Sequence, residues 1–108
     1  MDWDSIEADT KELLDLQSGW ERPILWDLGK LCEESGEVAE CLVKSTKSKE
    51  DLGDELDDLL TVIAVIAMKS NISMKEAHAR KQPARIEKAL KKYHGGVYPK
   101  RSKKAKGK

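Results

Sequence analysis

The sequence contains no phenylalanine, and aromatic residues make up only 5% of its 108 residues. A hydrophobic core must therefore be built from leucine, isoleucine, valine and alanine. The chain is long enough for one domain and too short for two, and a domain of this size buries only a small core. Because small helical domains often gain stability by pairing with another copy, we expect a homo-oligomer, either a homodimer or a homotetramer.

Cysteines and long apolar segments are also scarce. Cys32 and Cys41 are the only cysteines, and on one helix they would lie about 13 Å apart, too far for a disulfide. No CxxC pair or Cys/His cluster indicates a zinc site. The longest apolar run, residues 59–68, is too short to span a bilayer, and no apolar signal segment follows Met1. We therefore expect a cytoplasmic protein with reduced thiols and no membrane partner.

The charges balance to zero over the whole chain but are unevenly distributed. Residues 1–68 hold six basic and 18 acidic side chains, whereas residues 69–108 hold 14 basic and two acidic side chains. Such sorting indicates an acidic site and a basic region with separate roles. Residues 99–108 form a lysine-rich tail that we expect to be disordered, which leaves one folded domain over residues 1–98.

Apolar residues recur with helical period along this domain, and no strand pattern or glycine-rich phosphate loop interrupts them. Ser48 and Asp51 resemble a capping box, which places a helix start between them. Pro83 should kink or interrupt the last helix. Four helices are expected, over residues 3–17, 23–44, 48–70 and 73–94. The predicted fold is all-α, a four-helix antiparallel bundle.

Three glutamates gather on the expected second helix. Glu33, Glu34 and Glu37 stand at positions i, i+1 and i+4. Glu34 borders the apolar seam that Leu31 and Val38 form, where an unpaired carboxylate would be costly. A compensating interaction for this carboxylate is therefore expected.

The start of the third helix is more acidic still. Residues 50–58 contain six acids and no base. Like charges at i and i+4 disfavour a helix by about 0.2–0.5 kcal/mol per pair, so a compensating interaction is expected. A hard divalent cation such as Mg²⁺ binds carboxylate oxygens and is the simplest compensation. The alternative, a solvated helix start favoured by the helix dipole, explains Glu50 and Asp51 but not Asp58, two turns further on.

The two acidic segments together resemble the MazG-like nucleotide pyrophosphohydrolases. Residues 33–37 (Glu-Glu-Ser-Gly-Glu) match the EExxE half of the family pattern, and residues 51–54 (Asp-Leu-Gly-Asp), after a 13-residue spacer, resemble its ExxD half. The resemblance covers about residues 28–74 and implies a site for Mg²⁺, with Mn²⁺ as a substitute. The implied ligands are Glu34, Glu37, Asp51 and Asp54.

The same resemblance implies roles for further residues. Glu33 would act beside Glu34 and Glu37 in catalysis, supporting the ligands or positioning water. Because the first acid of ExxD is Asp51 here rather than glutamate, Glu50 or Asp58 is an alternative ligand. The implied reaction is hydrolysis of a nucleoside or deoxynucleoside triphosphate to the monophosphate and pyrophosphate, by attack of water on the α-phosphorus.

Phosphate and base contacts are less well defined by the sequence. Family members often carry a basic residue and an asparagine on the helix after the acidic pair. Arg85 is the nearest match, with Ala89 in place of the asparagine, and Lys92 follows, although both could belong to a solvated face. Trp20 and Trp26 flank the start of the second helix, where they either stack on a base or fill a core or dimer interface.

Two other interpretations stay open. A phosphoribosyl-ATP pyrophosphohydrolase shares the acidic helical pattern. A non-enzymatic dimeric bundle could instead bind nucleic acid through the basic tail. Because the acidic side chains of residues 50–58 would repel phosphate backbones unless a metal ion binds them, nucleic acid is not the partner that we expect. The main prediction is an enzyme whose partner is a nucleoside triphosphate.

Overall fold

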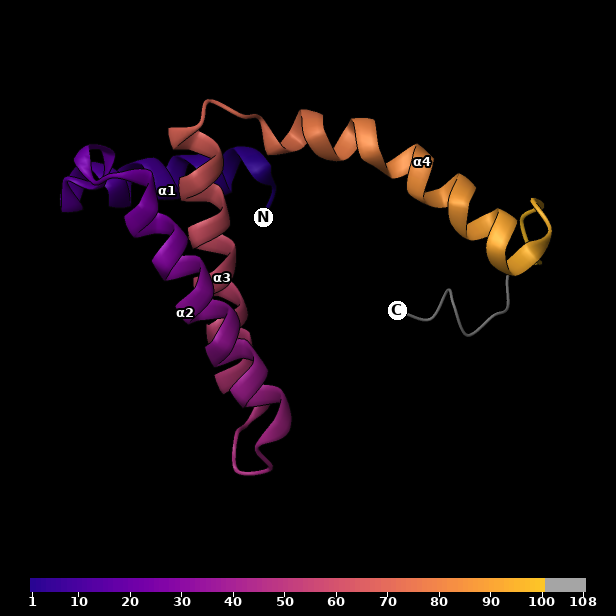
Figure 1. The fold of residues 1–108 in the computed structure, drawn as a ribbon, viewed down its shortest axis with the longest axis horizontal. Coiled ribbons are helices and arrows are strands. Elements are labelled where there is room, and N and C mark those ends of the chain that lie inside the picture. Colours follow the sequence, from indigo (N-terminus) through magenta and orange to yellow (C-terminus); the bar gives the residue numbers. More distant parts are fainter. Residues whose placement is uncertain (101–108) are drawn as a thin grey trace. The chain divides into compact units, whose positions relative to one another are not determined.

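The computed structural model describes residues 1–100, and every regular element among them is helical. The all-α fold class is therefore confirmed, and each helix lies within a few residues of its expected range. The tail expected over residues 99–108 falls outside the described residues from position 101 onward. The elements, labelled in Figure 1, are α1 (Trp3–Gln17), the 3₁₀ helix η1 (Gly19–Glu21), α2 (Ile24–Val43), α3 (Lys49–Lys69) and α4 (Met74–His94).

Local side-chain contacts explain where two of the helices begin. Asp2 caps α1, because its Oδ1 accepts a hydrogen bond from the Ser5 amide at 2.9 Å. Ser48 caps α3, and the predicted capping box is present: Ser48 Oγ accepts from the Asp51 amide at 3.0 Å, and Asp51 Oδ2 accepts from the Ser48 amide at 2.9 Å. The side chain of Asp51 is thereby committed to the helix terminus.

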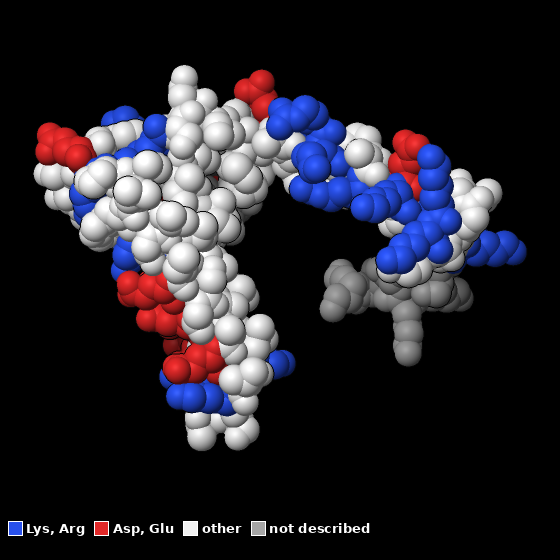
Figure 2. Space-filling view, in the orientation of Figure 1, with Lys and Arg blue, Asp and Glu red and all other residues white. Residues whose placement is uncertain are grey.

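Pro83 does not interrupt the last helix, which continues from Met74 to His94. A proline removes one backbone hydrogen bond and crowds the preceding turn, yet the flanking turns of a long helix can retain their own bonds. None of the residues of α4 is buried. Basic side chains follow this helix in Figure 2, whereas acidic side chains gather over α2 and α3.

The chain divides into two compact units, of which the first is Met1–Met74 and the second begins at Lys75. In the first unit, α2 and α3 run antiparallel side by side, and α1 packs on α3 near the end where α2 begins (Figure 1). The most buried apolar side chains there are Leu14, Cys41, Ala64, Val65 and Ala67. That residues 1–98 form one domain remains a prediction.

The apolar seam expected on α2 is only partly covered. Leu31 and Val38 are half-buried, whereas Leu28 is 51% exposed and Leu42 is 67% exposed. Leu28 and Leu42 lie near opposite ends of this seam, so their exposed side chains leave apolar area that another surface could cover. No helix among residues 1–100 combines the length and apolarity needed to cross a membrane.

A buried ion pair fixes the connection between α1 and α2 to the end of α3. Lys69 Nζ lies 2.6 Å from Asp27 Oδ2, and the two side chains are only 7% and 2% exposed. The same ammonium donates to the carbonyl oxygens of Gly19 at 2.9 Å and Arg22 at 2.7 Å. Three acceptors therefore satisfy the three donors of this lysine.

Gly19 is required by the close approach of this connection to α1. A Cβ atom at position 19 would lie 2.5 Å from Leu14 Cδ2 and 2.8 Å from an Arg22 guanidinium nitrogen. A larger residue would therefore require the Leu14 side chain, the Arg22 side chain or the connection itself to shift. The connection is thus held on both sides, and the start of α2 is placed with it.

Candidate metal centre and adjoining cleft

Carboxylates from α2 and α3 meet at the interface of these two helices. Glu33, Glu34 and Glu37 on α2 each bring one oxygen to within 4.8 Å of the others. Glu34 also forms such a group with Glu55 and Asp58 on α3. Glu34 belongs to both groups, so the five side chains form one continuous cluster, which we call the carboxylate cluster.

Glu34 is the most buried member of the carboxylate cluster, with only 7% of its surface exposed. This confirms its expected place at the seam. Burial raises the pKa of Glu34, and the negative charges of Glu37 and Asp58 raise it further, while the Lys30 ammonium acts in the opposite direction. The protein therefore holds a carboxyl group where its charged form is disfavoured.

Glu55 shows the strongest effect of this crowding. A hydrogen bond with Glu37, followed by burial and by the charges of Glu37, Asp58 and Glu34, raises the pKa of Glu55 to about 7. A hydrogen bond between two carboxyl groups requires a proton on one of them. In the metal-free protein at neutral pH, Glu55 therefore carries this proton for part of the time.

The structure brings together only part of the predicted ligand set. Glu34 and Glu37 lie in the carboxylate cluster with Glu33, and so does Asp58, which was an alternative ligand. Asp51 lies outside both groups, because Ser48 engages its carboxylate at the helix start and lowers its pKa. Asp54 and Glu50 are exposed and also lie outside them.

Glu55 and Asp58, one turn after Asp51 and Asp54, are the α3 residues that the structure brings to the carboxylate cluster. Residues 55–58 (Glu-Leu-Asp-Asp) fit the ExxD pattern without the Glu-to-Asp exchange that Asp51 requires. That exact match was the available signal. Asp51, Glu55 and Asp58 share one stripe of α3, so helical periodicity alone does not distinguish the first turn from the second.

The donor set of the carboxylate cluster fits a hard divalent cation. All five side chains offer carboxylate oxygens, the ligands that Mg²⁺ and Mn²⁺ prefer. Within residues 1–100, Glu34 Oε2 and Glu55 Oε2 are buried without a hydrogen-bond partner. Buried polar atoms are normally satisfied, and a bound cation would satisfy both oxygens and offset the like-charge repulsion.

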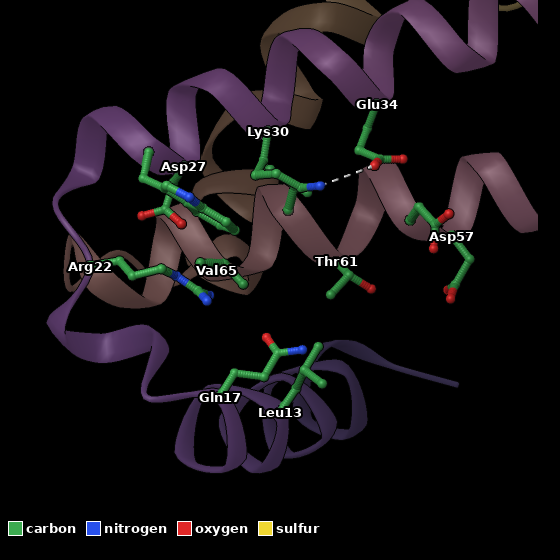
Figure 3. Close-up of a pocket in the computed structure, with 12 residues that line it drawn as sticks. Leu13, Gln17, Arg22, Asp27, Lys30, Glu34, Asp57, Thr61 and Val65 are labelled. Atoms are coloured by element: carbon green, nitrogen blue, oxygen red, sulfur yellow. Dashed lines mark ion pairs between the residues drawn. The ribbon is translucent and has the colours of Figure 1, made fainter.

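A cleft of about 500 Å³ adjoins the carboxylate cluster within the first unit, between α1, α2 and α3 (Figure 3). This volume lies in the range of about 300–1,000 Å³ that is typical of small-molecule sites. Glu34, Asp57 and Asp58 line one end of the cleft. Its other lining residues include Leu13, Gln17, Arg22, Trp26, Asp27, Lys30, Thr61, Val62 and Val65.

Two basic residues of the cleft were not among the sequence candidates. Lys30 is half-buried and pairs with Glu33 at 3.3 Å and Glu34 at 3.8 Å, so its ammonium stands beside the carboxylate cluster. The Arg22 guanidinium carbon lies 3.9 Å from the centre of the Trp26 ring. The sequence feature that could have predicted the role of Lys30 is its position one helical turn before Glu34 on α2.

The remaining candidates occupy different surroundings. Trp26 lines the cleft, but Trp20 instead donates its indole N–H to Asp15 at 2.7 Å. Arg85 and Lys92 lie on α4 in the second unit, where both side chains are exposed. Arg85 donates to Gln82 at 3.4 Å, and the Lys92 ammonium lies 5.3 Å from the centre of the Tyr93 ring.

Both cysteines are free thiols on α2, with Cys32 exposed and Cys41 buried. Burial raises the pKa of Cys41, and the nearby Glu55 charge raises it further. A thiol whose pKa is raised stays protonated and unreactive at neutral pH.

Comparisons with protein-family models, curated proteins and solved structures find no match to this chain.

Proposed function

We propose that the protein is a Mg²⁺-dependent pyrophosphohydrolase that cleaves nucleoside or deoxynucleoside triphosphates to the monophosphate and pyrophosphate. The observation that carries this proposal is the carboxylate cluster at one end of a nucleotide-sized cleft, with an ammonium beside it. The resemblance of the two acidic segments to MazG-like enzymes supports the same chemistry. The ExxD half of that resemblance is assigned here to Glu55 and Asp58.

Glu34, Glu37, Glu55 and Asp58 are the residues that would hold the cation. When bound, Mg²⁺ neutralises charge on phosphate oxygens and lowers the pKa of water near the α-phosphorus. Glu33 is more exposed than Glu34, and its carboxylate contacts Lys30. Glu33 is therefore the group that we assign to orient the attacking water and accept its proton.

The residues that line the cleft support one direction for the proposed substrate. Lys30 stands beside the carboxylate cluster, so its ammonium can pair with a phosphate oxygen in place of Glu33. Trp26 lies eight residues before Glu34, about 12 Å along α2 at helical rise. This separation suits a nucleoside whose base contacts Trp26 while its α-phosphate reaches the acids.

The antiparallel bundle predicted for the four helices of one chain remains a prediction, and we propose that the chain assembles as a homo-oligomer. The seam of α2 exposes Leu28 and Leu42, and a second copy of the chain is the proposed cover for it. In such a homo-oligomer, helices of two copies would complete the antiparallel packing. A homodimer and a homotetramer both satisfy this requirement.

Pyrophosphate release from a panel of triphosphates, measured with Mg²⁺ and with EDTA, tests the proposed function. The panel should contain the common ribo- and deoxyribonucleotides and phosphoribosyl-ATP, which addresses the related pyrophosphohydrolase activity. We expect Mg²⁺-dependent release from at least one nucleoside triphosphate. The absence of release from every substrate would contradict the proposal.

A further inference from the structure

We infer that the end of the cleft around Arg22 selects nucleobases with a carbonyl group at position 4 of a pyrimidine or position 6 of a purine, namely uracil, thymine and guanine, over cytosine and adenine, which carry an amino group there. The distinguishing groups are the substituents at position 4 of a pyrimidine and position 6 of a purine. This inference rests on the proposed function, because it assumes that the acids bind the phosphate end of a nucleotide. It adds the class of base, which the carboxylate cluster does not define.

The Arg22 guanidinium is available for a ligand. Within residues 1–100, no carboxylate forms an ion pair with it, and its buried Nε atom has no hydrogen-bond partner. The group instead lies against the Trp26 ring, 3.9 Å from the ring centre. A cation at this distance from an indole is favourably placed, and the stacking limits its rotation.

The backbone that carries Arg22 is held in place as well. Lys69 Nζ binds the Arg22 carbonyl oxygen at 2.7 Å and the Asp27 carboxylate at 2.6 Å. Gly19 allows the connection to pass close to α1. Donors that are positioned before binding discriminate between ligands better than mobile ones, because less conformational entropy is lost on binding.

Arg22 and Gln17 point into the same space in Figure 3, Arg22 from the connection before α2 and Gln17 from the end of α1. Leu13 and Val65 supply apolar surface to the cleft beside them. Apolar surface beside polar side chains suits a nucleobase, whose faces are apolar and whose edges carry polar groups. Arg22 and Gln17 are then the groups that would contact the polar edge of the base.

The hydrogen-bonding capacity of these side chains gives the expected selectivity. A guanidinium only donates, so it pairs with a carbonyl oxygen and leaves an exocyclic amino group unsatisfied. The Gln17 amide both donates and accepts, so it is compatible with the ring N–H beside this carbonyl but does not itself distinguish the bases. Asp27 Oδ2 already accepts from Lys69 at 2.6 Å, and the selectivity is assigned to the Arg22 donors.

The test is the equilibrium affinity of the full-length protein for nucleoside monophosphates, measured by isothermal titration calorimetry. We expect dUMP to bind tighter than dCMP, and GMP tighter than AMP, each on the order of tenfold, as for one specific base-edge contact. Arg22→Met keeps the length of the side chain and removes its donors, so the two affinities in each pair should become nearly equal. Lys44→Met, which removes an exposed cation at the far end of α2, should keep the wild-type preference.

Several outcomes would overturn the inference. One is wild-type protein that binds dCMP as tightly as dUMP, a result that does not depend on whether any variant folds. Another is an equal loss of affinity for all four ligands in Arg22→Met, which would assign Arg22 to the phosphate. Because monophosphates are not hydrolysed, a base preference without pyrophosphate release would remove only the proposed function, whereas release without a preference would remove only this inference.

Discussion

Glu55 links the carboxylate cluster to the stability of the metal-free protein. Its pKa rises from an ordinary value of 4.5 to about 7 in the folded state, chiefly through the hydrogen bond with Glu37 and through burial. The folded protein therefore binds this proton more tightly than the unfolded chain does. The resulting stabilisation is complete below about pH 4.5 and is lost as the pH rises through about 7.

We therefore expect the Tm of the wild-type protein in EDTA to fall between about pH 5 and about pH 8. Glu55→Gln removes the titrating group, so its Tm should vary less with pH and should exceed the wild-type Tm at the alkaline end. Glu12→Gln, an exposed substitution on α1, is the control and should keep the wild-type pH dependence. A wild-type Tm that is constant over this range would contradict the raised pKa.

At the scale of the helices, the buried ion pair between Lys69 and Asp27 stabilises the first unit by joining the end of α3 to α2. Lys69→Met keeps the aliphatic chain but leaves the buried Asp27 carboxylate without its partner. Removing one member of a buried pair costs about 3–5 kcal/mol, because the remaining charge is uncompensated. We expect a loss of this size in the free energy of unfolding, measured by urea denaturation.

Lys44→Met provides the matched comparison, because it breaks an exposed pair with Glu40 on the same helix that carries Asp27. Exposed pairs contribute about 0–1 kcal/mol, so this variant should be close to wild type. If Lys69→Met and Lys44→Met changed the free energy of unfolding equally, the contacts of Lys69 would not be what holds the connection between α1 and α2.

The helices were largely predictable because their signals are local. The capping box at Ser48 and the apolar period of α1 set helix ends within a few residues, and the seam around Glu34 predicted its burial. Helical period did not predict whether Asp51 or Glu55 lies in the carboxylate cluster, since both lie on one stripe of α3. The answer depends on which turn of α3 lies beside Glu34 and Glu37 of α2, and this is set by tertiary packing.

Long-range pairing was also beyond the sequence. Lys69 and Asp27 are separated by 42 residues and meet only because α3 returns antiparallel to α2. The places of Arg22 and Lys30 in a cleft were likewise not predicted, because the cleft that they line is formed by three helices together. The candidates on α4, such as Arg85, follow from the family pattern and not from a predicted cleft.

The molecule as a whole exposes apolar side chains that a lone small domain would be expected to bury. On α2 these include Leu25 at 72% exposure and Val43 at 82%, in addition to the seam residues Leu28 and Leu42. Apolar surface of this kind supports the proposed assembly. The short chain and the small apolar core had already led us to expect a homo-oligomer.

The proposed homo-oligomer makes a measurable prediction. Sedimentation equilibrium should give the mass of a dimer or tetramer, and the Tm should rise with protein concentration, because association stabilises the folded state by mass action. Leu28→Lys, at the seam, should shift the equilibrium towards smaller species. A monomer whose Tm is independent of concentration would contradict the assembly.

We propose that one cation-binding unit, formed by α2 and by residues 55–58 of α3, performs the hydrolysis. The decisive measurement is kcat/KM for Mg²⁺-dependent pyrophosphate release in two sets of amide variants. We expect Glu37→Gln and Glu55→Gln each to lower kcat/KM by about 100-fold or more, and the double variant to lose little more, because the groups act as one unit. Asp51→Asn and Asp54→Asn, which change acids outside the carboxylate cluster, should stay close to wild type. Near wild-type release by both Glu37→Gln and Glu55→Gln would contradict the claim, as would a collapse of activity confined to the Asp51 and Asp54 variants.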